Sequence, residues 1–424
     1  MNKSFQKNGT RLIIMTLVFL EVACMSSGQK NSNTMNTKKS NFNKGTYGYD
    51  VAFFEDRQIP TVELKNEQSK ASLLIVPAYQ GRVMTSSASG DSGKSFGWIN
   101  YKLIESGKVS SQFNPYGGEE RLWFGPEGGP FSIYFSKGKE QVFDNWIVPK
   151  EIDTKPFETV AQTTNSVTFR KEFELTNASG TSMRIGVDRT VKLLSLAECE
   201  QAIQIEIDAA LDIVAYESKN ILTNKGKSAW TEESGFLSIW LLSMFNPSEK
   251  GVVFIPFKEG SQTDLGKVVT DDYFGKVPSD RLIEKDQILF FKTDGKFRSK
   301  IGISPQRALP YCGSYDPTSH VLTLLWYSKA EDQEKYVNSK WGKQDNPLSG
   351  DVINSYNDGP VADGSVMGPF FEIESSSPAA MLAPGEKITH KQRIFHISGD
   401  EAHLSLITEK LFNVSIFKIK QVFQ

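Results

Sequence analysis

The segment from Asn114 to Pro130, NPYGGEERLWFGPEGGP, carries the densest group of side chains in the sequence that could do chemistry. Its five glycines and three prolines interrupt any regular strand, so we expect it to connect elements. Yet it carries three carboxylates, one arginine and three aromatic side chains, and connecting segments usually lack large aromatics, because exposing them wastes apolar burial. The candidate binding residues in it are Tyr116, Glu119, Glu120, Arg121, Trp123 and Glu127.

This combination of side chains suits a sugar. An aromatic face packs on the C–H surface of a sugar ring, while carboxylates and guanidinium groups take the hydroxyls in paired hydrogen bonds. A structural interpretation is equally open. In it, Trp123, Phe124 and Phe131 close one end of a β-sandwich, and Arg121 neutralises a glutamate.

A second pair of carboxylates lies near the C-terminus, in FFEIES, which reads as a strand. Alternation places Glu372 and Glu374 on one face, about 6.6–7 Å apart by the rise of a strand. Two carboxylates at that spacing can divide acid and base roles if their environments separate their pKa values, which makes both candidate catalytic residues. The alternative is a solvated outer face.

Basic residues cluster around Arg281, at Arg298 and Lys300, and at Arg307. Because an arginine fork suits planar anions, these residues could hold a uronate or a sulfated sugar, and we expect Arg121 or Arg307 to steady the substrate. A solvated face with ion pairs within a sheet is the alternative.

The four histidines are His320, His390, His396 and His403, and surface or capping roles are expected for them rather than catalysis. No Cys/His cluster indicates zinc, and no cofactor is predicted. Calcium held by loop carboxylates is conceivable, but no EF-hand spacing supports it. Cys199 and Cys312 could pair, although two buried free thiols are favoured.

The elements that must position these groups are strands. Val167, Phe169, Phe173 and Leu175 alternate with polar residues, as in a half-buried strand. Further strands are predicted at 73–76, 185–194, 203–214, 237–245, 252–257, 288–292, 321–327, 370–376 and 388–397. With so little helix, the chain is predicted to be all-β, either two large antiparallel sheets packed face to face or a barrel.

Helical signals are confined to the C-terminal end. A short helix is predicted after Asp400, because Leu404, Ile407 and Leu411 share one face. A second short helix capped by Ser415 is one interpretation, and an extended strand is the other. No linker interrupts residues 47–424, which are predicted to form a single domain.

The N-terminus predicts export. Basic residues precede an apolar run from Leu12 to Leu20, which is too short to span a bilayer, and Ala23 precedes Cys24. We therefore expect a signal peptide over 1–23, lipidation of Cys24, and a flexible tether over 24–46, rich in Ser, Asn and Lys. An ordinary cleaved signal with an incidental cysteine is the alternative.

The charge balance limits the partners. Lys and Arg number 48 against 50 Asp and Glu, a net charge of −2, which offers no field for nucleic acid and no strong pull toward anionic lipid headgroups. The expected partners are an oligosaccharide or polysaccharide and a membrane reached only through the lipid anchor. A monomer in the periplasm or at the cell surface, such as an outer-membrane lipoprotein, is expected.

Several segments carry a family resemblance. GGEERLWFGPEGG, SMFNPSEKGVVFIPF, DDYFGKVPSDRL, FRSKIGISPQRA and PFFEIESSSPAAMLAPGEK resemble a domain-of-unknown-function family within the galactose mutarotase (aldose 1-epimerase) superfamily, over roughly residues 50–412. The resemblance implies a β-supersandwich of two large antiparallel sheets holding a sugar on a concave face. It also implies an exported bacterial protein associated with polysaccharide degradation.

The resemblance carries the catalytic glutamate of the epimerases onto Glu372 or Glu374. Their mid-chain histidine has no counterpart, since the nearest segment is Met244-Phe245-Asn246-Pro247. Two hypotheses therefore remain. The chain either performs acid/base chemistry on a sugar, as an epimerase, glycosidase or lyase, or it is a non-catalytic oligosaccharide-binding or structural envelope lipoprotein.

Overall fold

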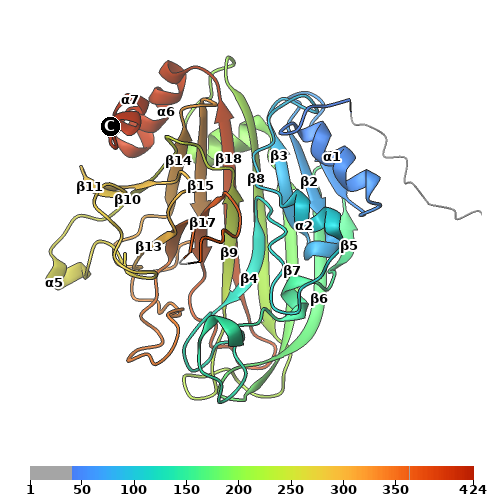
Figure 1. The fold of residues 1–424 in the computed structure, drawn as a ribbon, viewed down its shortest axis with the longest axis vertical. Helices are drawn as coiled ribbons and strands as arrows, with labels where there is room; N and C mark the ends of the chain where they lie inside the picture. The colour runs from blue at the N-terminus through green and yellow to red at the C-terminus, as the bar shows by residue number, and fades with distance from the viewer. Residues whose placement is uncertain (1–40, 362) are drawn as a thin grey trace, which may run out of the picture. The chain divides into compact units, whose positions relative to one another are not determined.

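The computed structural model describes residues 41–361 and 363–424. The predicted signal peptide, Cys24 and residues 24–40 of the predicted tether lie outside the described residues. The first helix of the described residues is α1, Tyr47–Asp56 (Figure 1).

The largest sheet has ten strands, and each neighbouring pair is antiparallel. Its β6 contains the alternating residues Val167, Phe169, Phe173 and Leu175, all of which are buried. The strands in sheet order are β11 (Leu282–Lys285), β12 (Ile288–Lys292), β10 (Val252–Pro256), β14 (Tyr311–Asp316), β15 (Val321–Tyr327), β18 (Lys387–Ser398), β8 (Asp212–Asn224), β7 (Ser182–Leu193), β6 (Ser166–Thr176) and β5 (Glu158–Gln162).

Two smaller antiparallel sheets complete the strands. The five-stranded sheet has the order β13 (Ser299–Ile303), β16 (Ile353–Asn357), β17 (Phe371–Ser376), β9 (Ser238–Phe245) and β4 (Arg121–Gly125). The three-stranded sheet has the order β1 (Val62–Lys65), β2 (Ser72–Val76) and β3 (Arg82–Ser87), and the sequence did not predict it as a separate sheet.

One apolar core joins the two larger sheets. Val167 of β6 and Leu325 of β15 belong to the same buried cluster as Phe124 of β4 and Ile373 of β17. Since residues of both sheets fill one core, the sheets pack face to face, as a sandwich requires. The predicted all-β fold with two large antiparallel sheets is confirmed.

The two C-terminal helices cover the opposite face of the ten-stranded sheet, where Leu404, Ile407 and Ile416 pack in one cluster with Phe254 and Phe395 (Figure 1). Helix α6, Glu401–Phe412, begins at Asp400, whose side chain accepts from the amides of Ala402 and His403. The predicted helix is confirmed. Of the two interpretations for the segment after Ser415, the helix is observed, as α7, Ile416–Gln421.

Other helices are short and lie in connections. They are α2 (Tyr101–Ser106), α3 (Lys150–Asp153), α4 (Leu196–Ile203) and α5 (Gln262–Leu265), with 3₁₀ turns η1 (Pro77–Tyr79) and η2 (Phe143–Asn145). The predicted strand 203–214 is wrong for most of its length, because residues 204–211 link α4 to β8. Ile205 and Ile207 are buried in that link, which explains the alternation without a strand.

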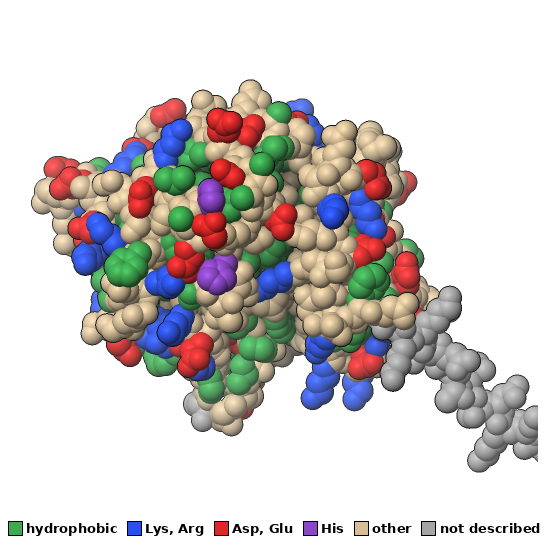
Figure 2. All heavy atoms as spheres, turned by 90° about the horizontal axis from the view of Figure 1, so that it is seen from above, with side chains coloured by type: hydrophobic (Ala, Val, Ile, Leu, Met, Phe, Trp, Pro, Cys, Tyr) green, Lys and Arg blue, Asp and Glu red, His purple; other side chains and the backbone are tan. Residues whose placement is uncertain are grey.

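The cysteines, the helices and the charged side chains are relevant to the partners that the protein could have. Cys199 and Cys312 are both buried and unpaired. Within the described residues, none of the helices has the length and apolar character needed to cross a membrane, and no group of His, Cys, Asp and Glu side chains is placed to hold a metal ion. On the face shown in Figure 2, acidic and basic side chains are interspersed, in keeping with the small net charge.

Candidate functional site

The register of the five-stranded sheet brings the two predicted acidic regions onto one face. Arg121 of β4 pairs with Leu242 of β9, which pairs with Glu374 of β17. Because strand side chains alternate, Trp123 and Glu372 share this face with Arg121 and Glu374. Two segments about 250 residues apart in sequence therefore present their chemistry side by side, on the face that points away from the core.

A hollow of about 680 Å³, counting space open to solvent, lies over these residues. Four of the seven tryptophans of the chain line it: Trp123, Trp146, Trp240 and Trp341. Three further apolar side chains at its edge are exposed, Phe143 at 58%, Phe274 at 49% and Met367 at 41%. Exposed apolar side chains gathered around a concave surface are typical of a ligand site.

Two ion pairs lie among these aromatic rings. Arg121 Nη2 is 3.1 Å from Glu372 Oε1, and its guanidinium carbon lies 3.9 Å from the centre of the Trp123 ring. Lys300 Nζ is 2.7 Å from Glu374 Oε2, which also accepts from Trp240 Nε1 at 2.9 Å. All four charged groups are at most 12% exposed, so each charge needs its partner.

The electrostatics of the site favour proton transfer by Glu372. Burial raises the pKa of Glu372 from 4.5 to about 7, with Arg121 opposing the shift and Glu374 adding to it. A carboxyl with a pKa near neutrality can both donate and accept a proton at working pH. Burial also raises the pKa of Glu127, which lines the same hollow, against the opposing effect of Lys300.

Several polar atoms of this hollow are buried without a hydrogen-bond partner in the described part of the chain. They are Nε and Nη1 of Arg121, Nε1 of Trp123, Nε1 of Trp146 and Oε1 of Glu374. Buried polar groups are nearly always partnered, so these five atoms need partners from outside the described chain, such as water or a ligand. Four donors and one acceptor could be satisfied by a ligand rich in hydroxyl groups.

The hollow continues into a second one. Six residues line both: Glu127, Phe143, Phe274, Arg298, Lys300 and Trp341. The second hollow adds Asp272, Tyr273, Ser339 and Lys340 to the lining, and Lys340 Nζ lies 3.0 Å from Asp272 Oδ1. Because they share six lining residues, the two hollows together form one groove.

Comparison with known protein families gives one match. Residues 45–423 match the model of a family described as "Family of unknown function (DUF6786)". The chain belongs to this family. Among curated proteins, none matches the chain.

Solved structures resemble this one weakly. The Slr1438 protein from Synechocystis sp. PCC 6803 is 13% identical with a TM-score of 0.49, over 80% of this chain and 96% of that one. A putative aldose 1-epimerase (b2544) from Escherichia coli K12 is 10% identical with a TM-score of 0.47, over 80% and 99%. A putative mutarotase (YeaD) from Salmonella typhimurium is 12% identical with a TM-score of 0.44, over 82% and 99%.

Five of the sequence-predicted residues line the hollow, namely Arg121, Trp123, Glu127, Glu372 and Glu374. Four others do not line this hollow, which corrects their assignment to this site: Tyr116, Glu119, Glu120 and Arg307.

Strand alternation and buried partners explain why Glu120 lies outside the hollow, and buried partners explain the position of Glu119. Glu120 immediately precedes Arg121 and points to the other side, where it pairs with Arg189 at 2.8 Å and accepts from Gln392. Glu119 accepts from Ser86 and lies 2.9 Å from His396 Nε2. Both glutamates are fully buried between the sheets.

The other two are held by aromatic and backbone groups. Tyr116 stacks on Tyr79 with ring centres 4.2 Å apart, in the small cluster beside α1. Arg307 donates to four backbone carbonyls, at Lys258, Gly260, Ser261 and Gly266, so its guanidinium fixes a connecting segment.

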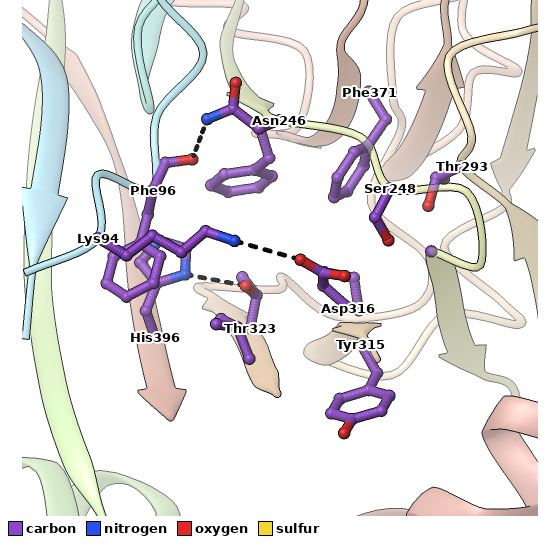
Figure 3. A pocket seen from close by; sticks show the side chains of 14 residues that line it. Lys94, Phe96, Asn246, Ser248, Thr293, Tyr315, Asp316, Thr323, Phe371 and His396 are labelled. Carbon is purple, nitrogen blue, oxygen red and sulfur yellow. Dashed lines mark hydrogen bonds and ion pairs between the residues drawn. The ribbon is translucent and has the colours of Figure 1, made fainter. Parts of the chain in front are cut away.

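His396 lines a different hollow together with residues of β9, β14, β15 and β17, shown in Figure 3. Its Nδ1 is 2.8 Å from Thr323 Oγ1, and its ring stacks on Phe96. His390 and His396 are at most 1% exposed, which corrects the expected surface role for both. Burial lowers the pKa of His390 to about 3, so it is neutral.

Sequence reasoning missed most of the aromatic lining. Trp146 and Trp341 lie outside strands, and Trp240 lies in β9, whose residues are buried on both faces and show no alternation. The Arg298–Lys300 cluster gave the one usable signal, since both residues line the hollow. Of the other basic residues, Arg281 pairs with Asp294 and lies outside it.

Proposed function

We propose that the groove on the outer face of the five-stranded sheet binds a saccharide and that Glu372 exchanges a proton with it. One observation carries the proposal: four indole side chains line one hollow together with Arg121 and Glu374, and residues of this lining carry five unpartnered buried polar atoms. Flat aromatic faces suit the C–H surface of a sugar ring, and the unpartnered donors and acceptor suit its hydroxyls. No metal or cofactor enters the proposal.

The residues that line the groove would have different roles, which follow from their chemistry. Trp341, at 36% exposure, is the indole of the lining most open to a sugar ring, while Arg121 and Glu374 each keep polar atoms without a partner in the described chain. Glu372, with its pKa raised by burial to about 7, would give a proton to a ring or bridging oxygen, or remove one from a hydroxyl or a carbon. Epimerisation, hydrolysis and elimination all need such a group.

A binding screen followed by turnover tests the two halves separately. Thermal shift and tryptophan fluorescence over a panel of neutral, uronic and sulfated oligosaccharides should reveal a ligand, because ligand binding raises the stability of the native state. Glu372→Gln should then keep the affinity within a few fold and lose turnover of that ligand, followed by NMR. Glu217→Gln, in the Glu217–Arg393 pair of the ten-stranded sheet, is the matched control and should change neither.

The outcomes separate the alternatives. A ligand that binds but that the wild-type protein does not convert would leave a non-catalytic binding protein. Absence of any ligand across the panel would refute the saccharide site.

We also propose that the chain is an exported lipoprotein serving polysaccharide breakdown in the periplasm or at the cell surface. The charged and apolar residues before Cys24 support this. Labelled palmitate should enter the wild-type protein and not Cys24→Ala, and recovery of both forms unlabelled in the cytosol would contradict export.

A further inference from the structure

Arg298 differs from the other cations of the groove. Four cations line its two hollows, and three of them pair with a carboxylate: Arg121 with Glu372, Lys300 with Glu374 and Lys340 with Asp272. Arg298 forms neither an ion pair nor a hydrogen bond through its side chain with the described residues. A guanidinium keeps its charge at any working pH, so this charge is left for something else.

The position of Arg298 is fixed without using its donors. Its guanidinium carbon lies 4.1 Å from the centre of the Phe274 ring, and Phe274 packs edge-on against Tyr356. A guanidinium stacked on an aromatic face keeps its N–H edges free for a ligand. Asp358, the nearby acid, is already engaged by Tyr356 Oη and the amide of Gly368.

Arg298 also lies where the two hollows meet. It lines both of them, as Lys300 does, so the two basic side chains face the same groove. The one groove acid without an ion pair in the described chain is Glu127, whose pKa is raised by burial. Arg298 is therefore the one cation of the groove that no ion pair of the described residues engages.

We infer that the saccharide is anionic, and that Arg298 binds its carboxylate or sulfate group at the junction of the two hollows. This inference rests on the proposed function and adds the substrate class to it. The shared chemistry is a planar or tetrahedral oxyanion on a sugar, which an arginine fork takes through paired N–H···O bonds.

The test compares matched ligands by isothermal titration calorimetry. Oligogalacturonate, sulfated galacto-oligosaccharide and the neutral galacto-oligosaccharide of equal length are titrated into the wild-type chain, Arg298→Gln and Arg298→Lys. We expect at least one anionic ligand to bind at least tenfold tighter than the neutral one. Arg298→Gln should remove that advantage and change the neutral affinity less than twofold. Arg298→Lys should retain part of it, since a lysine keeps the charge and loses the fork.

Arg184→Gln is the matched control, because Arg184 is 61% exposed on β7 of the other sheet, and it should leave all three affinities unchanged. The carboxylated and sulfated arms show which oxyanion is read. Equal affinities for neutral and anionic ligands, or an equal loss for all of them in Arg298→Gln, would overturn the inference while the saccharide site stands. Binding of none of the three would overturn it together with the saccharide site.

Discussion

Both faces of the five-stranded sheet carry acidic and basic side chains, but the two faces use them for different purposes. On the face toward the ten-stranded sheet, Glu120 accepts from Arg189 and Gln392, and Gln392 in turn accepts from Ser375. Arg189 donates three hydrogen bonds: from Nε to the carbonyl of Gly81, from Nη1 to Asn220 and from Nη2 to Glu120. These charges are fully buried and fully partnered, so they specify how the sheets dock and leave nothing for a ligand.

On the outer face, to which the next residue along each strand points, the charged groups are only partly paired. Arg121 pairs with Glu372 through a single nitrogen, and Glu374 keeps one oxygen without a partner in the described chain. Buried polar atoms without partners cost stability unless something else satisfies them. We take this difference as the mark of function: the Glu120–Arg189 pair holds the fold, and the outer pairs are arranged to be completed by a ligand.

The largest expected effect tests the inner face. Arg189→Leu leaves Glu120 as a buried charge without its main partner, which should cost about 3–5 kcal/mol of unfolding free energy in urea melts. Arg170→Leu is the matched control, because Arg170 pairs with Asp188 at 58% exposure, and its cost should stay below about 1 kcal/mol. Equal costs for the two variants would show that the inner pair has no special structural role.

A smaller effect is expected from the outer face, on binding rather than folding. Trp240→Ala removes a ring that lines the groove and donates to Glu374, and we expect a tenfold to hundredfold loss of saccharide affinity, equivalent to about 1.4–2.8 kcal/mol.

Trp326→Ala is the control for that variant, since Trp326 stacks on Tyr311 outside the groove and should affect stability alone. If Trp240→Ala bound the saccharide with wild-type affinity, the claim that the outer face is a binding surface would be wrong.

The comparison also explains what the sequence could reveal. Alternation placed Glu372 and Glu374 on one face correctly, because β17 is a regular strand. Alternation also places Glu120 inward and Arg121 outward, because the glycine-rich connection becomes β4 at Arg121. This was not predicted, because the whole segment was expected to be a connection. Gly117 and Gly118 adopt φ values of +87° and +113°, which only glycine takes readily. The two glycines therefore indicate the turn before β4, but they do not show at which residue the turn ends and the strand begins.

The aromatic lining could not be predicted, because it depends on long-range folding. Trp146 and Trp341 have rings 6.2 Å apart but lie in connecting segments far apart in sequence. No periodicity links such segments, since their contact is set by where the strands deliver them. The predictions for residues 1–40, including lipidation of Cys24, remain predictions.

The smallest expected effect sharpens the outer face and concerns pH. Because burial raises the pKa of Glu372 from 4.5 to about 7, the folded chain holds this proton more tightly than the unfolded chain. Its contribution therefore favours the folded state fully below pH 4.5 and is lost as pH rises to about 7. Glu372→Gln stays neutral throughout, so it should lack this loss.

Melting temperatures of the wild type and Glu372→Gln, measured from pH 4 to 8, should therefore diverge in one direction. The wild type should lose a few degrees relative to the variant between pH 4.5 and about 7, and the difference should be constant outside that range. Glu372→Asp keeps a carboxyl beside Arg121 and should retain the step. A step that survives in Glu372→Gln would place the titrating group elsewhere, and the outer face would then lack the proton donor that distinguishes it from the inner one.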